Sequence, residues 1–117
     1  MEGVRMEGGA SRIAGKTADG WIIGNRLYRP ALIATADFAG TLPGLTLDRL
    51  DAATLPALGD AELLLLGTGA TLQRPSAGFV EGCRQRGWRV EPMDSAAAAR
   101  TFNVLVAEER QVAALIL

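Results

Sequence analysis

The chain has 117 residues, of which 49% are hydrophobic, with 12 Lys and Arg against 13 Asp and Glu. This composition is typical of one globular domain with its own core, and the net charge of -1 gives no electrostatic argument for nucleic acid or anionic membranes as partners. The sequence has no histidine and a single cysteine, which excludes His-based catalysis and multi-thiolate metal sites and favours a reducing compartment. We therefore expect a cytoplasmic protein without a metal or a cofactor.

Residues 1–11 are polar and glycine-rich, and we expect them to form a flexible N-terminal tail before a single domain that spans residues 12–117. This segment contains no apolar core of signal-peptide length. No apolar run in the chain approaches the ~20 residues that a membrane helix needs. We therefore expect no membrane span.

The N-terminal half predicts an antiparallel β meander. Asp19-Gly20 is typical of a tight hairpin turn, and Gly24-Asn25 is a second turn signal. Apolar segments flank both turns, and a further apolar run occupies residues 31–34. After the meander, Thr46 suits the N-cap of a short helix, which Pro56 would limit.

The C-terminal half predicts the order β-α-β-α-β. A run of four leucines at residues 63–66, followed by glycine, is typical of a strand buried on both faces. Four further elements follow in chain order. The first is a helix that begins at Pro75 and ends just before Gly87, with Phe79, Val80 and Cys83 on its apolar face. After it come a strand at 88–93, a helix at 95–109 capped by Asp94 or Ser95, and a strand at 112–117. The whole order predicts an α/β domain in which helices pack on a mixed sheet.

Four segments of this half resemble the Mth938-like (DUF498) family: residues 64–69 (LLLGTG), 86–94 (RGWRVEPMD), 100–108 (RTFNVLVAE) and 113–116 (AALI). The resemblance extends over roughly residues 13–117 and implies a single-domain three-layer α/β fold with a mixed central sheet. The family includes the mitochondrial complex I assembly factor 3, and its bacterial members are small cytoplasmic proteins. The mitochondrial relatives carry a targeting segment that is missing here, so we expect a bacterial protein. The resemblance transfers no catalytic residue.

Two segments are candidates for binding a ligand. The turn Gly67-Thr68-Gly69 is able to present N–H groups to an anion, and Arg74 beyond it is able to bind a carboxylate or phosphate. The turn lacks the third glycine of a dinucleotide fingerprint and no Gly-Lys-Ser/Thr follows. A purely structural turn and a solvated arginine are the alternative interpretations.

The helix at 95–109 places Arg100 and Asn103 opposite the predicted core stripe of Ala98, Phe102, Leu105 and Val106. A polar pair among small and apolar residues predicts a partner surface or the wall of a small pocket. Alternatively, Arg100 pairs with a carboxylate and Asn103 caps a loop. Cys83 is expected to act as a small buried hydrophobe.

These observations favour a non-enzymatic interaction protein, similar to an assembly factor, with an unidentified protein partner. By resemblance, the process would be assembly of respiratory complex I. Self-association into a homo-oligomer stays open. The alternative is a small-molecule or anion-binding protein, or an enzyme, that uses Gly67, Thr68 and Gly69 together with Arg74, Arg100 and Asn103.

Overall fold

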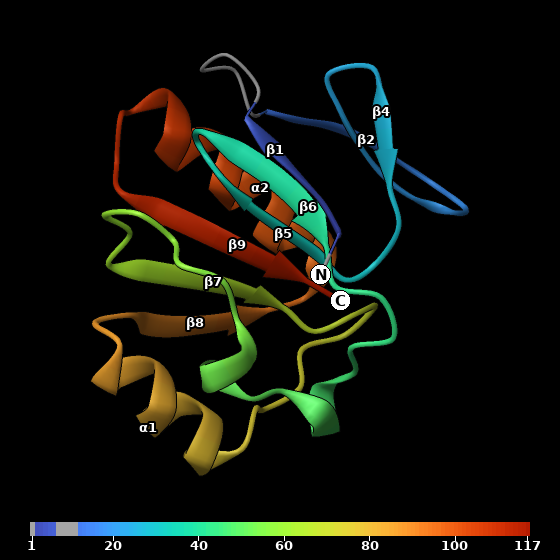
Figure 1. Cartoon of the computed structure of the whole chain (residues 1–117). Coiled ribbons are helices and arrows are strands. Elements are labelled where there is room, and N and C mark those ends of the chain that lie inside the picture. Colours follow the sequence, from blue (N-terminus) through green and yellow to red (C-terminus); the bar gives the residue numbers. More distant parts are fainter. Residues whose placement is uncertain (1, 7–11) are drawn as a thin grey trace.

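The computed structural model describes residues 2–6 and 12–117, and these form a three-layer α/β fold (Figure 1). The central layer is a six-stranded mixed sheet. Its strands are β1 (Glu2–Met6), β5 (Leu32–Thr35), β6 (Phe38–Thr41), β7 (Leu63–Gly67), β8 (Arg89–Met93) and β9 (Val112–Ile116). They lie in the order β1-β6-β5-β9-β7-β8, with β7, β8 and β9 parallel and the remaining pairs antiparallel.

One face of this sheet is covered by the helix α2 (Ser95–Ala107) and by a separate three-stranded antiparallel sheet. The strands of the small sheet are β2 (Ile13–Thr17), β3 (Gly20–Ile23) and β4 (Arg26–Tyr28). The opposite face is covered by α1 (Ala77–Gln85) and by two 3-10 turns, η1 (Leu47–Arg49) and η2 (Ala52–Thr54). The central sheet is therefore buried from both sides.

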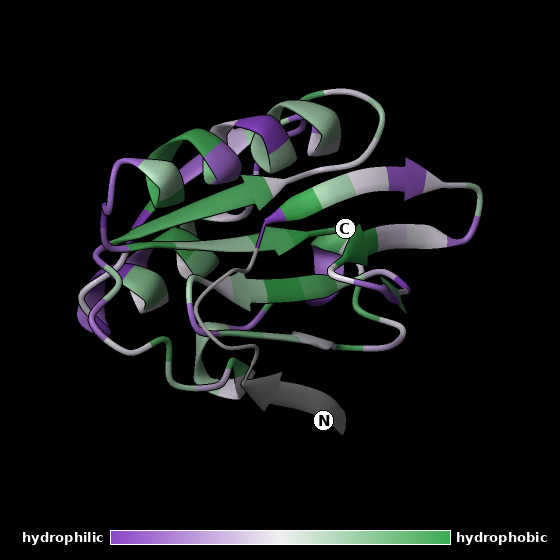
Figure 2. Ribbon diagram, turned by 90° about the horizontal axis from the view of Figure 1, so that it is seen from above, coloured by the Kyte–Doolittle hydropathy of each residue, from purple (hydrophilic) through white to green (hydrophobic). Residues whose placement is uncertain are grey.

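The leucines of strand β7 pack into two hydrophobic cores, one on each face of the central sheet. Leu64 and Leu66 belong to the apolar cluster on the α1 side, whereas Leu65 belongs to the cluster on the α2 side. Successive side chains of a strand point to opposite faces, so a run without polar residues suits a strand with a core on each side. Figure 2 shows the hydrophobic strands of the central sheet lying between the outer layers. The predicted fold class is confirmed.

The expectation of a tail at residues 1–11 does not hold for residues 2–6, because they form β1 and pair antiparallel with β6. Residue 1 and residues 7–11 lie outside the described part. The backbone of a strand is satisfied by its neighbour, so an edge strand needs no apolar run that a sequence pattern would reveal. Residues 32–35 join the central sheet beside β9, and the three-stranded sheet ends at β4.

The short helix predicted after Thr46 is present only as the single 3-10 turn η1, and the second 3-10 turn, η2, follows it. The Thr46 hydroxyl donates to the Asp48 carboxylate at 2.6 Å and makes no cap, whereas Asp51 caps η2 by accepting from the Ala53 N–H at 3.0 Å. Side chains of this type compete with helix formation by bonding locally.

The ends of the two α-helices refine the prediction. Ser76, and not Pro75, starts α1, since its hydroxyl accepts from the Phe79 N–H at 3.1 Å. Asp94 caps α2 by accepting from the Ala97 N–H at 2.8 Å. Phe79 and Cys83 are buried as expected, but Val80 is 40% exposed and lies outside the core.

Candidate functional site

One cavity is lined by residues from the segments that follow the three parallel strands. Gly69 follows β7, Asp94 follows β8 and Leu117 follows β9, and all three line it. Its volume is about 620 Å³. The other walls come from β2, β3 and α2, through residues that include Arg12, Ile13, Lys16, Trp21, Arg100 and Asn103. We call this hollow the edge cavity. Ligands of open α/β sheets commonly bind beyond the carboxyl ends of the strands, as this cavity is placed.

The turn Gly67-Thr68-Gly69 is held by hydrogen bonds within the chain. The Thr68 N–H donates to the Met93 carbonyl at 2.9 Å, and the Gly69 N–H donates to the Ser95 hydroxyl oxygen at 2.8 Å. The same Ser95 hydroxyl donates to the Leu117 carbonyl at 2.9 Å. Both N–H groups are therefore already satisfied and are not available to an anion.

Each residue of this turn has a local structural role. A Cβ added to Gly67 would lie 2.9 Å from the Ser95 Cα, so glycine permits the close approach of α2 to β7. Thr68 is buried, and its hydroxyl oxygen accepts from the Gln73 N–H at 2.9 Å and donates to the Thr71 carbonyl at 2.8 Å. Gly69 has a φ of 103°, which an L-residue rarely adopts.

Asn103 connects α2 to β2. Its side-chain oxygen accepts from the Ile13 N–H at 2.8 Å, and its side-chain nitrogen donates to the Ile13 carbonyl at 2.7 Å. The carboxamide thus pairs with one residue of β2 as a neighbouring strand would. We call this pair of bonds the Asn103 clamp.

The two candidate arginines have different surroundings. Arg100 is exposed, lines the edge cavity, and forms no hydrogen bond or ion pair with any of the described residues. Arg74 is exposed and does not line this cavity. Of the candidates from the sequence, the structure brings Gly69, Arg100 and Asn103 together at the cavity and leaves Gly67, Thr68 and Arg74 outside it.

The cavity residues that no sequence pattern singled out include Arg12, Lys16 and Trp21. They come from β2, β3 and the residue before β2, far from α2 in the chain. The Lys16 ammonium lies 5.5 Å from the centre of the Trp21 ring. No spacing or motif links these residues to Arg100, because only the packing of the small sheet against α2 brings them together.

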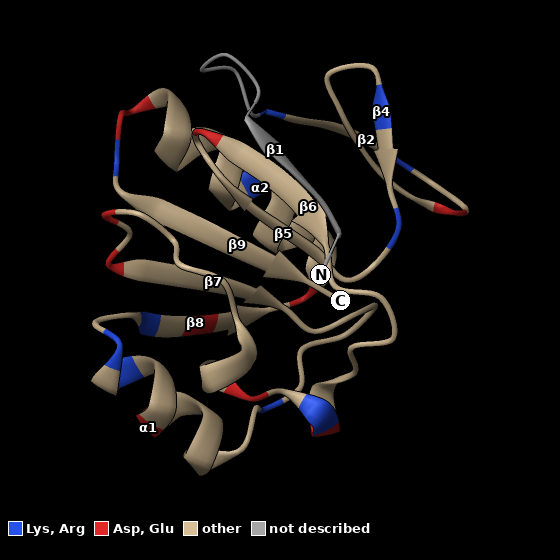
Figure 3. Cartoon of the chain, in the orientation of Figure 1, with Lys and Arg blue, Asp and Glu red and all other residues tan. Residues whose placement is uncertain are grey.

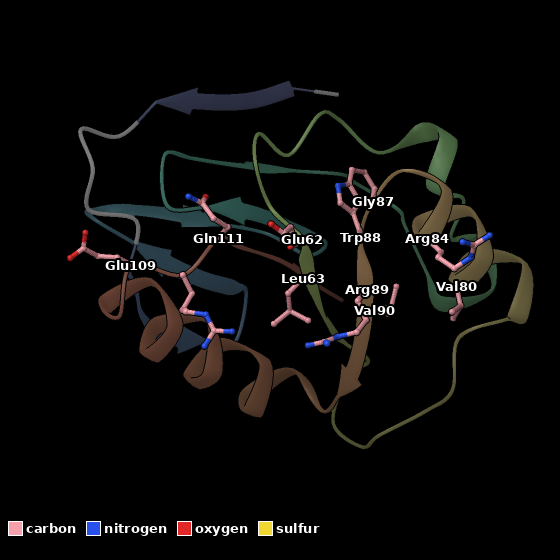
Figure 4. A pocket seen from close by; sticks show the side chains of 11 residues that line it. Glu62, Leu63, Val80, Arg84, Gly87, Trp88, Arg89, Val90, Glu109 and Gln111 are labelled. Atoms are coloured by element: carbon pink, nitrogen blue, oxygen red, sulfur yellow. The ribbon is translucent and has the colours of Figure 1, made fainter.

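A second hollow, of about 750 Å³, lies at the opposite edge of the sheet (Figure 4). Its residues come from the start of β7, from β8, from α1 and from the turn after α2, and they include Glu62, Val80, Arg84, Arg89 and Glu109. Arg84 there is bound to Glu81 at 2.6 Å, which lowers the pKa of Glu81 to about 2. Although this hollow is larger, its two acidic side chains nearly balance its three basic ones, and it lies at the amino ends of the parallel strands. We therefore regard the edge cavity as the better candidate.

Charged residues are absent from the central strands β5, β6, β7 and β9 and gather at the periphery (Figure 3). Within residues 2–6 and 12–117, no three His, Cys, Asp or Glu residues are grouped as a metal site would require. Over the same residues, neither helix has the length and apolar character needed to cross a bilayer.

The sequence of the chain is similar to proteins from bacteria and vertebrates. An uncharacterised protein of Rhodobacter capsulatus is 38% identical over 96 residues, covering 81% of this chain and 74% of that protein. The NADH dehydrogenase [ubiquinone] 1 alpha subcomplex assembly factor 3 of Xenopus tropicalis is 41% identical over 56 residues. That match covers 48% of this chain and 31% of the assembly factor.

Solved structures show the same fold. A Bordetella parapertussis protein superposes with a TM-score of 0.79 at 27% identity, covering 91% of this chain and 93% of that one. A Mth938-like domain of Bordetella pertussis superposes with a TM-score of 0.77 at 21% identity, covering 97% and 89%. The family of proteins of unknown function DUF498/DUF598 matches residues 13–117. The chain therefore belongs to the DUF498/DUF598 family and has the Mth938-like fold.

Proposed function

We propose that this chain is a cytoplasmic, non-enzymatic interaction protein that binds a protein partner during the assembly of a larger complex. The observation that carries the proposal is the 41% identity over 56 residues to a protein named as an assembly factor of NADH dehydrogenase. By that likeness, the partner is a subunit of a respiratory NADH dehydrogenase. The similarity covers about half of this chain and does not by itself locate the surface that binds.

The outward face of α2 is the surface that suits a partner best. Its exposed residues form a stripe along the helix: Ala96, Arg100, Val104 and Ala107. Val104 is 55% exposed, although it is a large apolar residue. This surface carries one arginine and no other charge, and the centre of a protein interface is likewise poor in charged residues but enriched in arginine. We call this set the α2 stripe.

The second candidate function is binding of a small molecule. The structure does not support binding of an anion by the Gly67–Gly69 turn, because the N–H groups of Thr68 and Gly69 are hydrogen-bonded within the chain. The edge cavity gives this candidate a different basis.

Affinity capture from native lysate tests the interaction proposal. The Val104→Asp variant places a charge on the α2 stripe and is expected to lose the partner. Val80→Asp is the matched control, because Val80 is an exposed valine on the other helix, which lies on the other face of the sheet. Both variants should melt at nearly the same temperature as the wild type, as exposed substitutions usually change stability by less than ~0.5 kcal/mol.

The expected result is that wild type and Val80→Asp retain a subunit of NADH dehydrogenase, identified by mass spectrometry, and that Val104→Asp does not. Retention by all three proteins would show that the partner binds elsewhere. Capture of no NADH dehydrogenase subunit by the wild type would contradict the assembly role.

A further inference from the structure

We propose that the edge cavity binds a small organic carboxylate with an apolar body. This site differs from the α2 stripe in its ligand and, apart from Ala96 and Arg100, in its residues. It also differs from an anion site at the Gly67–Gly69 turn, because it uses side chains of β2 and β3.

The side chains at the cavity favour an anion. Three of them are basic, Arg12, Lys16 and Arg100, and one is acidic, Asp94. The Asp94 carboxylate already accepts from the Ala97 N–H as the cap of α2. Arg12 and Arg100 make no ion pair with any residue of the described part. Two guanidinium groups without a carboxylate partner, on one cavity, suit a ligand with a carboxylate, which guanidinium binds bidentately.

The inner wall of the cavity is apolar. Ile13, Trp21 and Ala99 are each at least nine-tenths buried and line it. The indole Nε1 of Trp21 is buried and has no hydrogen-bond acceptor among the described residues. Such an unsatisfied donor is uncommon and costs free energy. A cavity of about 620 Å³ with an apolar wall and few polar groups is typical of a small-molecule site.

The Asn103 clamp joins the two walls of the cavity that carry the arginines. Arg12 directly precedes Ile13, whose N–H and carbonyl are bound by Asn103 at 2.8 and 2.7 Å. Arg100 lies three residues before Asn103 in α2, and residues at that spacing are neighbours on a helix surface. The clamp therefore fixes the backbone at both arginines before a ligand arrives, which lowers the entropic cost of binding.

Titration with 4-phenylbutyrate, followed through the indole N–H signals in proton–nitrogen spectra of labelled protein, tests this site. The two tryptophans serve as signal and control, since Trp21 lines the cavity and Trp88 is buried in the cluster on the other face of the sheet. We expect the Trp21 signal to shift and saturate while the Trp88 signal stays in place. Arg100→Ala should weaken this binding at least about tenfold, whereas Arg74→Ala, an exposed arginine outside the cavity, should not change it.

Two further probes separate the parts of the proposal. The neutral 4-phenylbutyramide should bind much more weakly than the carboxylate, and equal binding would overturn the role of the arginines. Inorganic phosphate should not reproduce the shift of Trp21; saturable phosphate binding with an inert 4-phenylbutyrate would overturn the role of the apolar wall. No movement of the Trp21 signal up to about 10 mM 4-phenylbutyrate, well above a weak millimolar dissociation constant, would overturn the site.

Discussion

Arg100 and Asn103 lie within one turn of α2, yet they interact very differently. Helical periodicity placed both opposite the buried Phe102, but only Arg100 is exposed, whereas Asn103 is half-buried and bound to β2. It gave no sign that β2 packs against this face, because Ile13 is 90 residues away in the chain. Asn103 therefore joins two layers, while Arg100 is left exposed at the cavity.

Asn103→Ala is predicted to destabilise the protein by about 1–3 kcal/mol, because it leaves the N–H and carbonyl of Ile13 without their partners. Arg100→Ala should change stability by less than ~0.5 kcal/mol. Urea denaturation of both variants measures the difference. Equal losses would mean that the clamp contributes nothing in solution.

Cys83 is fully buried on the inner side of α1, and this burial raises the pKa of its thiol to about 11. The sequence pattern predicted its place on the apolar face of the helix, although it wrongly included Val80 there. A thiol that is neutral and enclosed is inert, since the thiolate is the nucleophile.

Labelling of native Cys83 by a thiol reagent is predicted to be much slower than labelling of the unfolded chain. The raised pKa also affects stability. Between the ordinary value of 9.0 and about 11 the unfolded thiol loses its proton and the folded one keeps it, so stability falls as the pH rises through this range. Cys83→Ala should lose less stability over this pH range than the wild type. Parallel pH profiles for the two proteins would contradict burial of the thiol.

At the scale of elements, both α-helices end in the same motif with different residues. The Trp88 N–H donates to the Cys83 carbonyl and the Gly87 N–H to the Arg84 carbonyl, each at 2.9 Å. After α2, Arg110 and Glu109 make the corresponding bonds to Leu105 and Val106, also at 2.9 Å. These are Schellman motifs, whose residue after the C-cap adopts a positive φ. Gly87 has a φ of 88° there, and Glu109 has a φ of 60°.

Glu109→Gly is predicted to stabilise the protein by about 1 kcal/mol. Glycine removes the strain of a side chain in the left-handed region, which costs about 1–2 kcal/mol, but it also loses more conformational entropy on folding, which offsets part of the gain. Gly87→Ala should destabilise by a similar amount for the same reason. Thermal melts of the two variants should therefore move in opposite directions. A shift of both in one direction would rule out this account of the helix ends.

The close contact of α2 with β7 depends on Gly67, because glycine has no side chain. A Cβ at Gly67 would lie 2.9 Å from the Ser95 hydroxyl oxygen and 3.2 Å from the Ala98 Cβ. From the sequence, the glycine signalled a turn. Its closeness to the helix is a tertiary contact that no local pattern encodes.

Gly67→Ala is predicted to cost about 1–3 kcal/mol, as overpacking of a tight contact usually does. Gly15→Ala is the control, since a Cβ there would meet nothing within 4 Å. Chemical denaturation measures both. A neutral Gly67→Ala would show that α2 is able to move away from β7 at little cost.

At the scale of the molecule, one sheet carries two cores. Phe102 is buried on the α2 side and Leu66 on the α1 side, both with no exposed surface. The order of elements from residue 63 onward was readable because long apolar runs and helix caps are local signals. The hairpins β2-β3 and β3-β4 were also readable, from the turn signals at Asp19-Gly20 and Gly24-Asn25. Their separation from the central sheet and the cavity beside them were not, because they arise from how distant segments pack.

Because both cores share the central sheet, we predict one cooperative unfolding transition. Phe102→Ala should cost about 3–5 kcal/mol and Leu66→Ala about 2–5 kcal/mol, each by leaving a cavity. Both should lower the midpoint of the same transition, whether it is followed by circular dichroism or by tryptophan fluorescence. Separate transitions for the two probes would show that the layers unfold independently.

Strand β8 lies at the outer edge of the central sheet, next to β7 alone. The Arg89 N–H and the Met93 carbonyl bond toward the β7 side, so the main-chain groups of Val90 and Pro92 point outward. Proline has no N–H, and Val90 is thus left as the one outward donor along β8. The side chains of Arg89 and Glu91 add charge beside it. An incoming strand would find only one N–H donor on this edge of the sheet, so β8 resists edge-to-edge aggregation. Replacing Pro92 by threonine would add a second outward N–H and is expected to promote such aggregation.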